Sequence, residues 1–341
     1  MSRSHSSPGA AGGGETAGEA VELLRDAQGR PITYLRLSVT DRCNFRCWYC
    51  SPALWGARSE LLTAEELARV ARVFAGLGVR KVRLTGGEPL LRPDIVQIAS
   101  EVARTPGLRT LALSTNAARL ADLARPLREA GVYQLNISLD TLREETFRSI
   151  SAQGTVAEVL AGIDAAASAG FERIRLNTVV MEEVNSTEAP ELIRFAHDRG
   201  LVPRFIELMP FSPRGRPVPT RVLLERLDAA GVPLLPEPPR ADDGTAGPAR
   251  YYRAPTGPVG FVSAMTEGFC ASCNRVRVSA SGELRACLGG RAQVPLAGLL
   301  RGGASDGALA RAVREALERK PEGHRFGEGG QELASMMATG G

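Results

Sequence analysis

Short apolar runs alternate with amphipathic stretches through much of this chain, and this alternation limits the possible folds more than any other feature. The apolar runs are predicted to be strands at 33–39, 79–84, 108–113, 132–138, 173–180 and 202–207. The stretches between them are predicted to be helices at 64–77, 93–104, 120–130, 156–169 and 188–199. Such alternation is typical of a parallel sheet covered by helices. A closed barrel needs eight units, so we expect an α/β fold: an incomplete (βα)6 TIM-type barrel with an open side.

The alternation ends near Met209, after which proline and glycine accumulate. We therefore expect three parts: a flexible N-terminal tail at 1–30, a partial barrel at 31–209, and a smaller C-terminal domain at 210–341 that closes the opening. The residues before the first predicted strand lack the apolar segment of a secretory signal. No apolar run approaches the ~18 residues of a membrane span. We expect a cytoplasmic protein without a membrane partner, and a net charge of +4 is too small to indicate nucleic-acid binding.

The six cysteines form two groups of three, each one ligand short of a closed metal site. The first trio is Cys43-x3-Cys47-x2-Cys50 and the second is Cys270-x2-Cys273-x13-Cys287. A structural zinc ion requires four protein ligands, whereas a cubane iron–sulfur cluster normally binds one thiolate at each of its four irons. Three thiolates would leave one iron free to bind a small molecule. Each trio therefore predicts an iron–sulfur cluster with an open iron.

The cysteines allow two other interpretations, disulfides and zinc ligands. Disulfides belong mostly to oxidising compartments and to small domains, and neither fits a chain of 341 residues with few cysteines. Zinc would need a fourth ligand, but His5, His197 and His324 are the only histidines and none stands at zinc-finger spacing. Zinc remains an alternative for the second trio only.

Basic residues lie within the predicted strands, on one face of them. Arg36 shares parity with Ser38, and Lys81 with Arg83, while leucine and valine occupy the alternate positions. Helices cover the outside of a barrel, so the apolar face should point outward and the basic face inward. Buried cations are costly unless an anion meets them. One or two of these side chains could instead extend to the rim, but the whole set predicts a polyanionic ligand such as a nucleoside triphosphate: Arg36, Lys81, Arg83, Arg175 and Arg204.

Several motifs resemble known families. Cys-x3-Cys-x2-Cys with Tyr49 before its last cysteine is similar to the signature of radical S-adenosylmethionine (SAM) enzymes, and Gly86-Gly87-Glu88-Pro89 is similar to the stretch that receives the methionine amino group there. From Tyr34 to Gly341 the chain resembles the GTP 3′,8-cyclase family of molybdenum cofactor biosynthesis. The matching segments are LRLSVTDRCNFRCWYC, VRLTGGEPLLR, NISLDTL, RFIELMP, FCASCNRVRVSASGELRACL and a terminal Gly-Gly.

The resemblance assigns roles to individual residues. It implies that Cys43, Cys47 and Cys50 hold a [4Fe-4S] cluster that binds SAM, and that Cys270, Cys273 and Cys287 hold a second [4Fe-4S] cluster that binds guanine. It implies SAM contacts at Tyr49, Gly87, Glu88, Ser138 and Met209. It implies GTP contacts at Arg36, Lys81, Arg83, Ser114, Arg175, Arg204, Arg275, Val276 and Arg277. Catalytic roles are implied for Arg36, Arg275, Arg277, Gly340 and Gly341, the last two on a tail that reaches into the barrel.

The implied reaction converts GTP to 3′,8-cyclo-7,8-dihydro-GTP. A 5′-deoxyadenosyl radical takes the ribose 3′ hydrogen, and C3′ then attacks C8 of guanine. The implied partners are a low-potential electron donor of the flavodoxin or ferredoxin type and the next enzyme, cyclic pyranopterin monophosphate synthase, with a homodimer possible.

The chain departs from the family pattern at three places. Ala117 stands where the family has glycine, Arg175 where it has lysine, and Leu288-Gly289-Gly290 where an aromatic residue is more usual. Three other functions were considered: a radical enzyme acting on peptides, whose auxiliary domains usually carry more cysteines; a non-catalytic metal scaffold; and a relative acting on another purine nucleotide.

Overall fold

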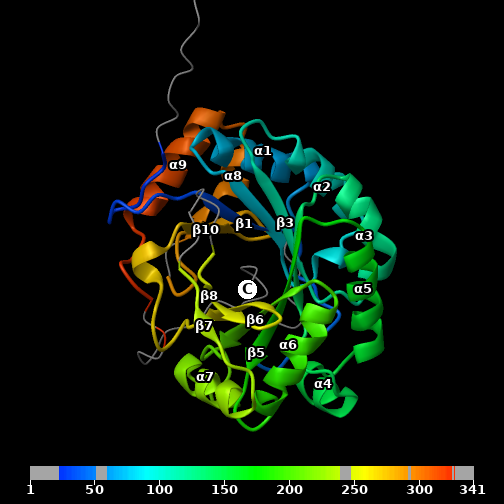
Figure 1. Cartoon of the computed structure of the whole chain (residues 1–341). Helices are drawn as coiled ribbons and strands as arrows, with labels where there is room; N and C mark the ends of the chain where they lie inside the picture. Colours follow the sequence, from blue (N-terminus) through cyan, green and yellow to red (C-terminus); the bar gives the residue numbers. More distant parts are fainter. Residues whose placement is uncertain (1–22, 51–59, 239–246, 291–292, 325, 327–341) are drawn as a thin grey trace, which may run out of the picture.

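The computed structural model describes residues 23–50, 60–238, 247–290, 293–324 and 326 (Figure 1). All six predicted strands form and pair in chain order as parallel neighbours. They are β1 (Tyr34–Ser38), β2 (Lys81–Thr85), β3 (Thr110–Thr115), β4 (Gln134–Ser138), β5 (Arg173–Val180) and β6 (Val202–Glu207). The five predicted helices also form, as α1 (Ala64–Gly76), α2 (Ile95–Ala103), α3 (Leu120–Glu129), α5 (Val156–Ser168) and α6 (Ala189–Asp198). The predicted alternation is confirmed.

The helix α4 (Glu144–Ser151) was missed by the sequence analysis. It is only eight residues long and has no side-chain hydrogen bond at its N-cap, so the start signal that marks α1 and α5 is absent. Those two helices each begin with a capping box, at Thr63 and at Thr155, in which the threonine hydroxyl and a glutamate three residues later bind each other's backbone N–H groups.

The region after Met209 adds strands to both edges of the barrel sheet. Beside β1 lie β10 (Arg275–Val278), β11 (Glu283–Arg285) and β12 (Gln293–Pro295). Beside β6 lie β9 (Gly257–Val262), β8 (Arg250–Ala254) and β7 (Leu235–Pro236). Both β10 and β9 are parallel to their barrel neighbours. The C-terminal part therefore covers both edges of the opening by continuing one twelve-stranded sheet, and the boundary at 209–210 stays a prediction.

Further helices complete the fold. They are α7 (Thr220–Ala229), α8 (Leu296–Arg301) and α9 (Asp306–Glu318), with short 3-10 helices η1 (Pro89–Leu91), η2 (Ser186–Glu188) and η3 (Cys270–Ser272). Figure 1 shows α1, α2, α3 and α5 along the outside of the curved sheet, and α8 and α9 near α1. None of the helices among the described residues has the length and the apolar character that a membrane span requires.

The predicted tail boundary at residue 30 was wrong. Residues 1–22 lie outside the described residues, but Leu24 is fully buried and its backbone N–H donates to the carbonyl of Leu77. Arg25 forms a β-bridge with Pro31, and between them Arg30 pairs with the buried Asp26. The segment is ordered because these contacts close a tight turn and tie it to the end of α1, a pattern that composition does not reveal.

The two faces of the sheet differ as the strand parity predicted. Leu35, Leu37 and Leu84 point to the helix-covered side, where they join the main core together with Phe74 of α1. The basic residues point to the inner side. Burial of the outer face supplies the hydrophobic free energy, at about 25 cal/mol per Å² of apolar surface, while the inner face stays free for polar groups.

Replacing Leu84 by alanine tests the outer core. The side chain is fully buried between sheet and helices, so its loss should lower the free energy of unfolding by about 2–5 kcal/mol. Leu235, which is 69% exposed, is the control, and Leu235→Ala should change that free energy by no more than about 0.5 kcal/mol. Urea denaturation of both variants measures the difference. Equal effects of the two substitutions would contradict the assignment of the outer face as the core.

Candidate active site

One cavity of about 350 Å³ contains nearly all the predicted site residues. All six cysteines line it, although the two trios are far apart in the sequence. So do the expected SAM contacts Tyr49, Gly87, Glu88, Ser138 and Met209, and the expected GTP contacts Arg36, Lys81, Arg83, Ser114, Arg175, Arg204, Arg275 and Arg277. Val276 does not line it: its side chain is fully buried in the core on the other face of β10. Gly340 and Gly341 lie outside the described residues.

The first trio lies on the loop that follows β1, at the carboxyl end of the parallel strands, where barrel enzymes place their active sites. Burial raises the pKa of Cys43 to about 11, and burial together with the neighbouring Cys43 raises that of Cys50 to about 12. Burial and the neighbouring acidic groups also raise the pKa of Cys47. The thiols thus oppose each other's ionisation, a condition that a positively charged metal group relieves.

The donor set of each trio fits an iron–sulfur cluster with one open iron. Each trio offers three free thiols that line the cavity. In a cubane cluster each thiolate binds a different iron, so three thiols leave one iron without a protein ligand. Among the described residues, no three histidine, cysteine, aspartate or glutamate side chains come close enough together to hold one metal ion.

The glycines after β2 hold the first trio's loop in place. A Cβ atom on Gly87 would lie 2.2 Å from the carbonyl oxygen of Arg42, the residue before Cys43. At Gly86 the backbone is in the left-handed region (φ +151°), and a Cβ atom would lie 2.4 Å from the carbonyl oxygen of Thr40. Backbone bonds join the same segments, from Gly87 N to Thr40 O (3.0 Å). Only glycine permits this approach.

Glu88 connects the ends of β2 and β3. Its Oε1 accepts from the backbone N–H of Leu90 and from the hydroxyl of Thr115, and its Oε2 accepts from the backbone N–H of Asn116. Burial raises the pKa of this carboxyl to about 7. Next to it, Ala117 has φ 64°, a left-handed conformation that costs a non-glycine residue roughly 1–2 kcal/mol. This conformation explains why the resembled family has glycine there.

Asp140, after β4, holds Tyr49 in place beside the first trio. The hydroxyl of Tyr49 donates to Asp140 Oδ2 (2.6 Å), and Oδ1 accepts from the backbone N–H of Val179 (2.8 Å). Burial raises the pKa of Asp140 to about 6. The sequence analysis missed this residue, although it follows the predicted SAM contact Ser138 at the end of a strand. An acidic residue directly after a predicted strand is the signal that would have found it.

The inner face of β10, β1 and β2 is a basic wall set by strand register. Arg36 is level with Arg83 on one side and with Arg277 on the other. Burial, together with the neighbouring arginines, lowers the pKa of Arg277 to about 10 and that of Lys81 to about 7. The cations are thus held away from water and repel one another. An anionic ligand in the cavity would remove that repulsion.

Tyr34, also missed by the sequence analysis, lies in the middle of this wall. It is level with Lys81 and Arg275, and the Lys81 ammonium is 5.2 Å from the centre of its ring. Burial raises the pKa of Tyr34, but Arg83 and the other cations outweigh burial and bring it to about 7. Tyr251 of β8 plays a similar part beside Arg204, whose own pKa burial lowers to about 9.

Several buried polar atoms of residues that line the cavity have no hydrogen-bond partner among the described residues. They are the Nε atoms of Arg83 and Arg175, the hydroxyl of Thr85 and Asn136 Oδ1. An unsatisfied buried polar atom costs about 1–3 kcal/mol. A set of them along one cavity indicates that a polar ligand completes the site.

The second trio is assembled by the β10–β11 hairpin. Cys273 precedes β10, and Arg277 is level with Arg285 on the antiparallel β11, so Cys287 returns to the same end of the hairpin. Burial raises the pKa of Cys273, but Arg275 and Lys320 outweigh it and bring it to about 7. This thiol is therefore close to its thiolate form, the form that binds metals.

Gly87→Ala tests the contact between the two loops. The added Cβ must displace the Arg42 carbonyl and with it Cys43, and misplacement of reacting groups by about 1 Å can cost about 100-fold in rate. We expect SAM cleavage to fall by about that factor, with less iron bound per chain after anaerobic reconstitution. Gly76→Ala in α1 is the matched control, because nothing lies within 4 Å of its Cβ position. Cleavage at the parent rate in Gly87→Ala would contradict the contact's role.

Comparison with known proteins agrees with this site. Residues 37–196 match the radical SAM superfamily, and residues 202–326 match the family described as Molybdenum Cofactor Synthesis C. GTP 3′,8-cyclase 1 of Pseudomonas aeruginosa is 47% identical over 328 residues, which cover 93% of this chain and 98% of that protein. GTP 3′,8-cyclase of Marinobacter nauticus is 45% identical over 330 residues, with the same coverage.

Solved structures agree in fold. Streptococcus suis SuiB bound to the precursor peptide SuiA has a TM-score of 0.60 at 15% identity, over 87% of this chain and 73% of that chain. At that identity the likeness concerns the fold alone. On the extent and identity of the sequence matches, the chain belongs to the radical SAM superfamily and, within it, to the GTP 3′,8-cyclase family.

Proposed function

We propose that this chain converts GTP to 3′,8-cyclo-7,8-dihydro-GTP, the first step of molybdenum cofactor biosynthesis. One observation carries the proposal. Tyr34 of β1 is level with Arg275 of the parallel β10, so Cys273 lies beyond the amino end of this strand pair and Cys43 beyond its carboxyl end. The basic wall lies between the two trios. A nucleotide there can contact one site with its base while its ribose faces the other.

The residues of the chain have separate tasks in this reaction. Cys43, Cys47 and Cys50 would hold the cluster that binds SAM, and Cys270, Cys273 and Cys287 would hold a second [4Fe-4S] cluster that binds guanine. With the cofactors bound, the chemistry supplied is reductive cleavage of SAM, removal of the ribose 3′ hydrogen and attack of C3′ on C8. Gly87 and the Tyr49–Asp140 pair would fix the position of SAM.

The basic wall, together with Arg175 of β5 and Arg204 of β6, would orient the substrate. Lys81, Arg83, Arg175 and Arg204 suit the triphosphate, because each is buried and faces the cavity. Arg36, Arg275 and Arg277 lie closer to the second trio along β1 and β10 and suit the guanosine. Groups fixed before the substrate arrives need no reorganisation during reaction. The triphosphate also offsets the repulsion among the cations, so binding and orientation come from the same contacts.

Further partners follow from the reaction. Reductive cleavage of SAM consumes one electron, and the nucleotide radical left after C3′ joins C8 needs a second electron and a proton to become the dihydro product. We propose that a low-potential donor of the flavodoxin or ferredoxin type supplies these electrons. The cyclised product is the substrate of cyclic pyranopterin monophosphate synthase, which we propose acts next. We also propose a cytoplasmic location, and a homodimer remains a possible assembly.

The direct test of the function is product analysis. Anaerobically reconstituted protein is incubated with GTP, SAM and a strong reductant, and the products are identified by mass spectrometry. The proposal expects 5′-deoxyadenosine and 3′,8-cyclo-7,8-dihydro-GTP in equal amounts. Formation of 5′-deoxyadenosine without any GTP-derived product would contradict it, and ATP used in parallel identifies a shift to another purine nucleotide.

Substitution of Arg277 by alanine should uncouple the reaction. Arg277 is on β10, whereas the expected SAM contacts belong to other elements, so cleavage should continue while the misplaced substrate is no longer attacked. Cyclised product per 5′-deoxyadenosine should fall by about 100-fold, and Arg275→Ala should act in the same direction. Arg72→Ala, on the exposed face of α1, is the control and should leave the ratio unchanged. If both Arg275→Ala and Arg277→Ala cyclise GTP at the parent rate, the assignment of these arginines is wrong.

Removal of Gly340 and Gly341 tests the predicted role of the chain end. If the tail reaches into the cavity, glycine suits it because it has no side chain to collide with the nucleotide. Truncation after Thr339 should leave the iron content and GTP affinity close to the parent values while cyclisation falls by at least about tenfold. These three quantities are measured side by side. Full activity of the truncated chain would show that the last two residues have no catalytic role.

A further inference from the structure

The turn at residues 26–30 is built around a buried ion pair that the proposed reaction does not use. Asp26 and Arg30 are 7% and 8% exposed. Asp26 Oδ2 accepts from the Nε of Arg30 at 2.6 Å, and Oδ1 accepts from the backbone N–H of Arg30 at 3.0 Å. The carboxylate therefore fixes both the backbone and the guanidinium of Arg30, which leaves the outer nitrogens of the guanidinium to bind elsewhere.

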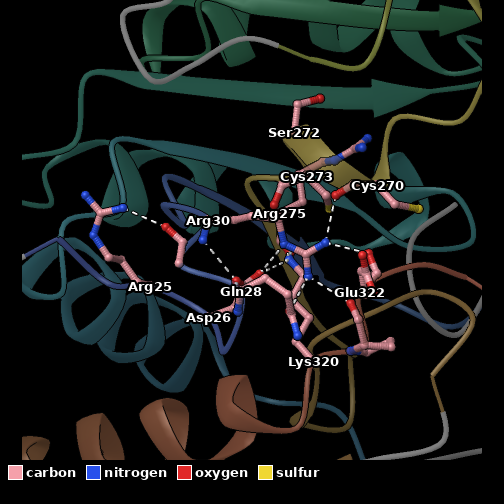
Figure 2. Close-up of polar contacts among 12 residues, drawn as sticks. Arg25, Asp26, Gln28, Arg30, Cys270, Ser272, Cys273, Arg275, Lys320 and Glu322 are labelled. Carbon is pink, nitrogen blue, oxygen red and sulfur yellow. Dashed lines mark hydrogen bonds and ion pairs between the residues drawn. The ribbon is translucent and has the colours of Figure 1, made fainter.

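Those outer nitrogens bind backbone carbonyls from two distant parts of the chain. Arg30 Nη1 donates to the carbonyl oxygens of Cys270 and Glu322, each at 2.7 Å. Nη2 donates to the carbonyl of Pro321 and to the Gln28 side chain, each at 2.8 Å. Figure 2 shows this guanidinium with Cys270 and Cys273 of the second trio on one side and Lys320 and Glu322 on the other. One buried side chain thus joins the N-terminal turn, a predicted cluster ligand and the approach to the C-terminal tail.

Lys320 binds the other end of the same loop. It is 3% exposed, and its Nζ donates to the carbonyl oxygens of Arg275 (2.8 Å) and Cys273 (3.4 Å). It also lies 3.8 Å from Asp26 Oδ2. Arg30 and Lys320 together hold the backbone at the start, middle and end of the loop from Cys270 to Arg275. This loop carries two thiol ligands and one arginine of the basic wall.

Asp26, Arg30 and Lys320 together carry a net positive charge. Within the part of the chain that the structure describes, Asp26 is the one carboxylate paired with Arg30 or Lys320. Two buried cations and one anion leave an excess positive charge, which is costly in a buried place. The second trio lies next to it, and cysteines that bind a metal do so as thiolates. The thiolates of a loaded site would supply the missing negative charge.

We propose that Asp26, Arg30 and Lys320 form a positioning cluster for the second iron–sulfur site. The positioning cluster holds the Cys270–Arg275 loop in the geometry that binds the metal group, and fixes the segment at 320–322 from which the chain continues to its C-terminal tail. The inference rests on the proposed function in one respect, that the second trio holds an iron–sulfur cluster. None of these three residues touches the substrate cavity, so they act through the residues they hold.

The choice of arginine at position 30 follows from this task. A guanidinium offers five N–H donors in a planar fork, whereas an ammonium offers three around one atom. Arg30 uses the fork to bind one carboxylate and three carbonyls at once. Lysine would keep the charge but could not span the same set of acceptors. Arg30→Lys therefore separates the geometric role from the charge.

The experiment measures how firmly each site retains iron. The full-length chain is prepared with Cys43, Cys47 and Cys50 replaced by alanine, so that only the second site is loaded, and iron loss to a chelator is followed by absorbance. Partners of metal ligands typically contribute 10–100-fold to metal affinity, so Arg30→Met should lose iron at least about tenfold faster. Arg30→Lys and Lys320→Met should be faster than the parent in the same direction.

Matched controls separate positioning from general stability. In the reciprocal background, with Cys270, Cys273 and Cys287 replaced by alanine, Arg30→Met should leave iron loss from the first site unchanged. Arg69→Met is the control for a lost arginine contact, because Arg69 also joins distant segments through Asp306 (2.8 Å) but lies away from both trios. It should leave both sites unchanged. Equal acceleration at both sites, or no acceleration at the second, overturns the proposal.

A second readout needs neither iron nor GTP. In metal-free protein, alkylation by iodoacetamide followed by mass spectrometry gives the rate at each cysteine. Arg30→Met should raise the rate at Cys273 several-fold relative to that at Cys47, and if this variant does not fold, Arg30→Lys gives the same comparison. Unchanged relative rates overturn the proposal. A failure of the proposed function gives another result. The parent chain would then form no cyclised GTP, but the relative alkylation rates would still change in the variants.

Discussion

The burial of several cations on the inner face of one sheet is the constraint on which the rest of this structure depends. Neighbouring strands place Arg277, Arg36 and Arg83 level with one another, in surroundings that lower the pKa of the buried lysine beside them to about 7. Such an arrangement is tolerated because the outer face, packed against the helices, supplies the stability. The inner face can then be specialised for an anion that is absent from the protein itself.

The pairing of β10 with β1 turns this basic face into a site between the two cysteine trios. One strand pair carries a cysteine trio beyond each end, and the arginines of both strands lie between them. A separate C-terminal domain docked on the opening would have to fix the distance between the trios through a domain interface. Continuing the sheet fixes it through hydrogen bonds and register. The turn at residues 26–30 adds a second restraint on the loop that carries Cys270 and Cys273.

Local sequence patterns predicted correctly which face of a strand each basic residue occupies. Strand parity placed Arg36, Lys81 and Arg83 on the inner face, and the shared parity of Arg275 and Arg277 agrees with the outward position of Val276. The pairing of β10 with β1 was not predictable, because a four-residue strand gives no signal for a partner far away in the sequence. For the same reason the ordered turn around Arg30 was assigned to the flexible tail, because most of the hydrogen-bond partners of Arg30 are far away in the sequence.

The central claim is that the basic wall presents the ribose of GTP to the SAM site with its C3′ hydrogen exposed to attack. The most direct test is incubation with GTP that carries deuterium at C3′, followed by mass spectrometry of the 5′-deoxyadenosine formed. The account predicts one deuterium in the 5′-deoxyadenosine and none at C3′ of the cyclised product. Unlabelled 5′-deoxyadenosine, formed together with cyclised product that retains the deuterium, would contradict it.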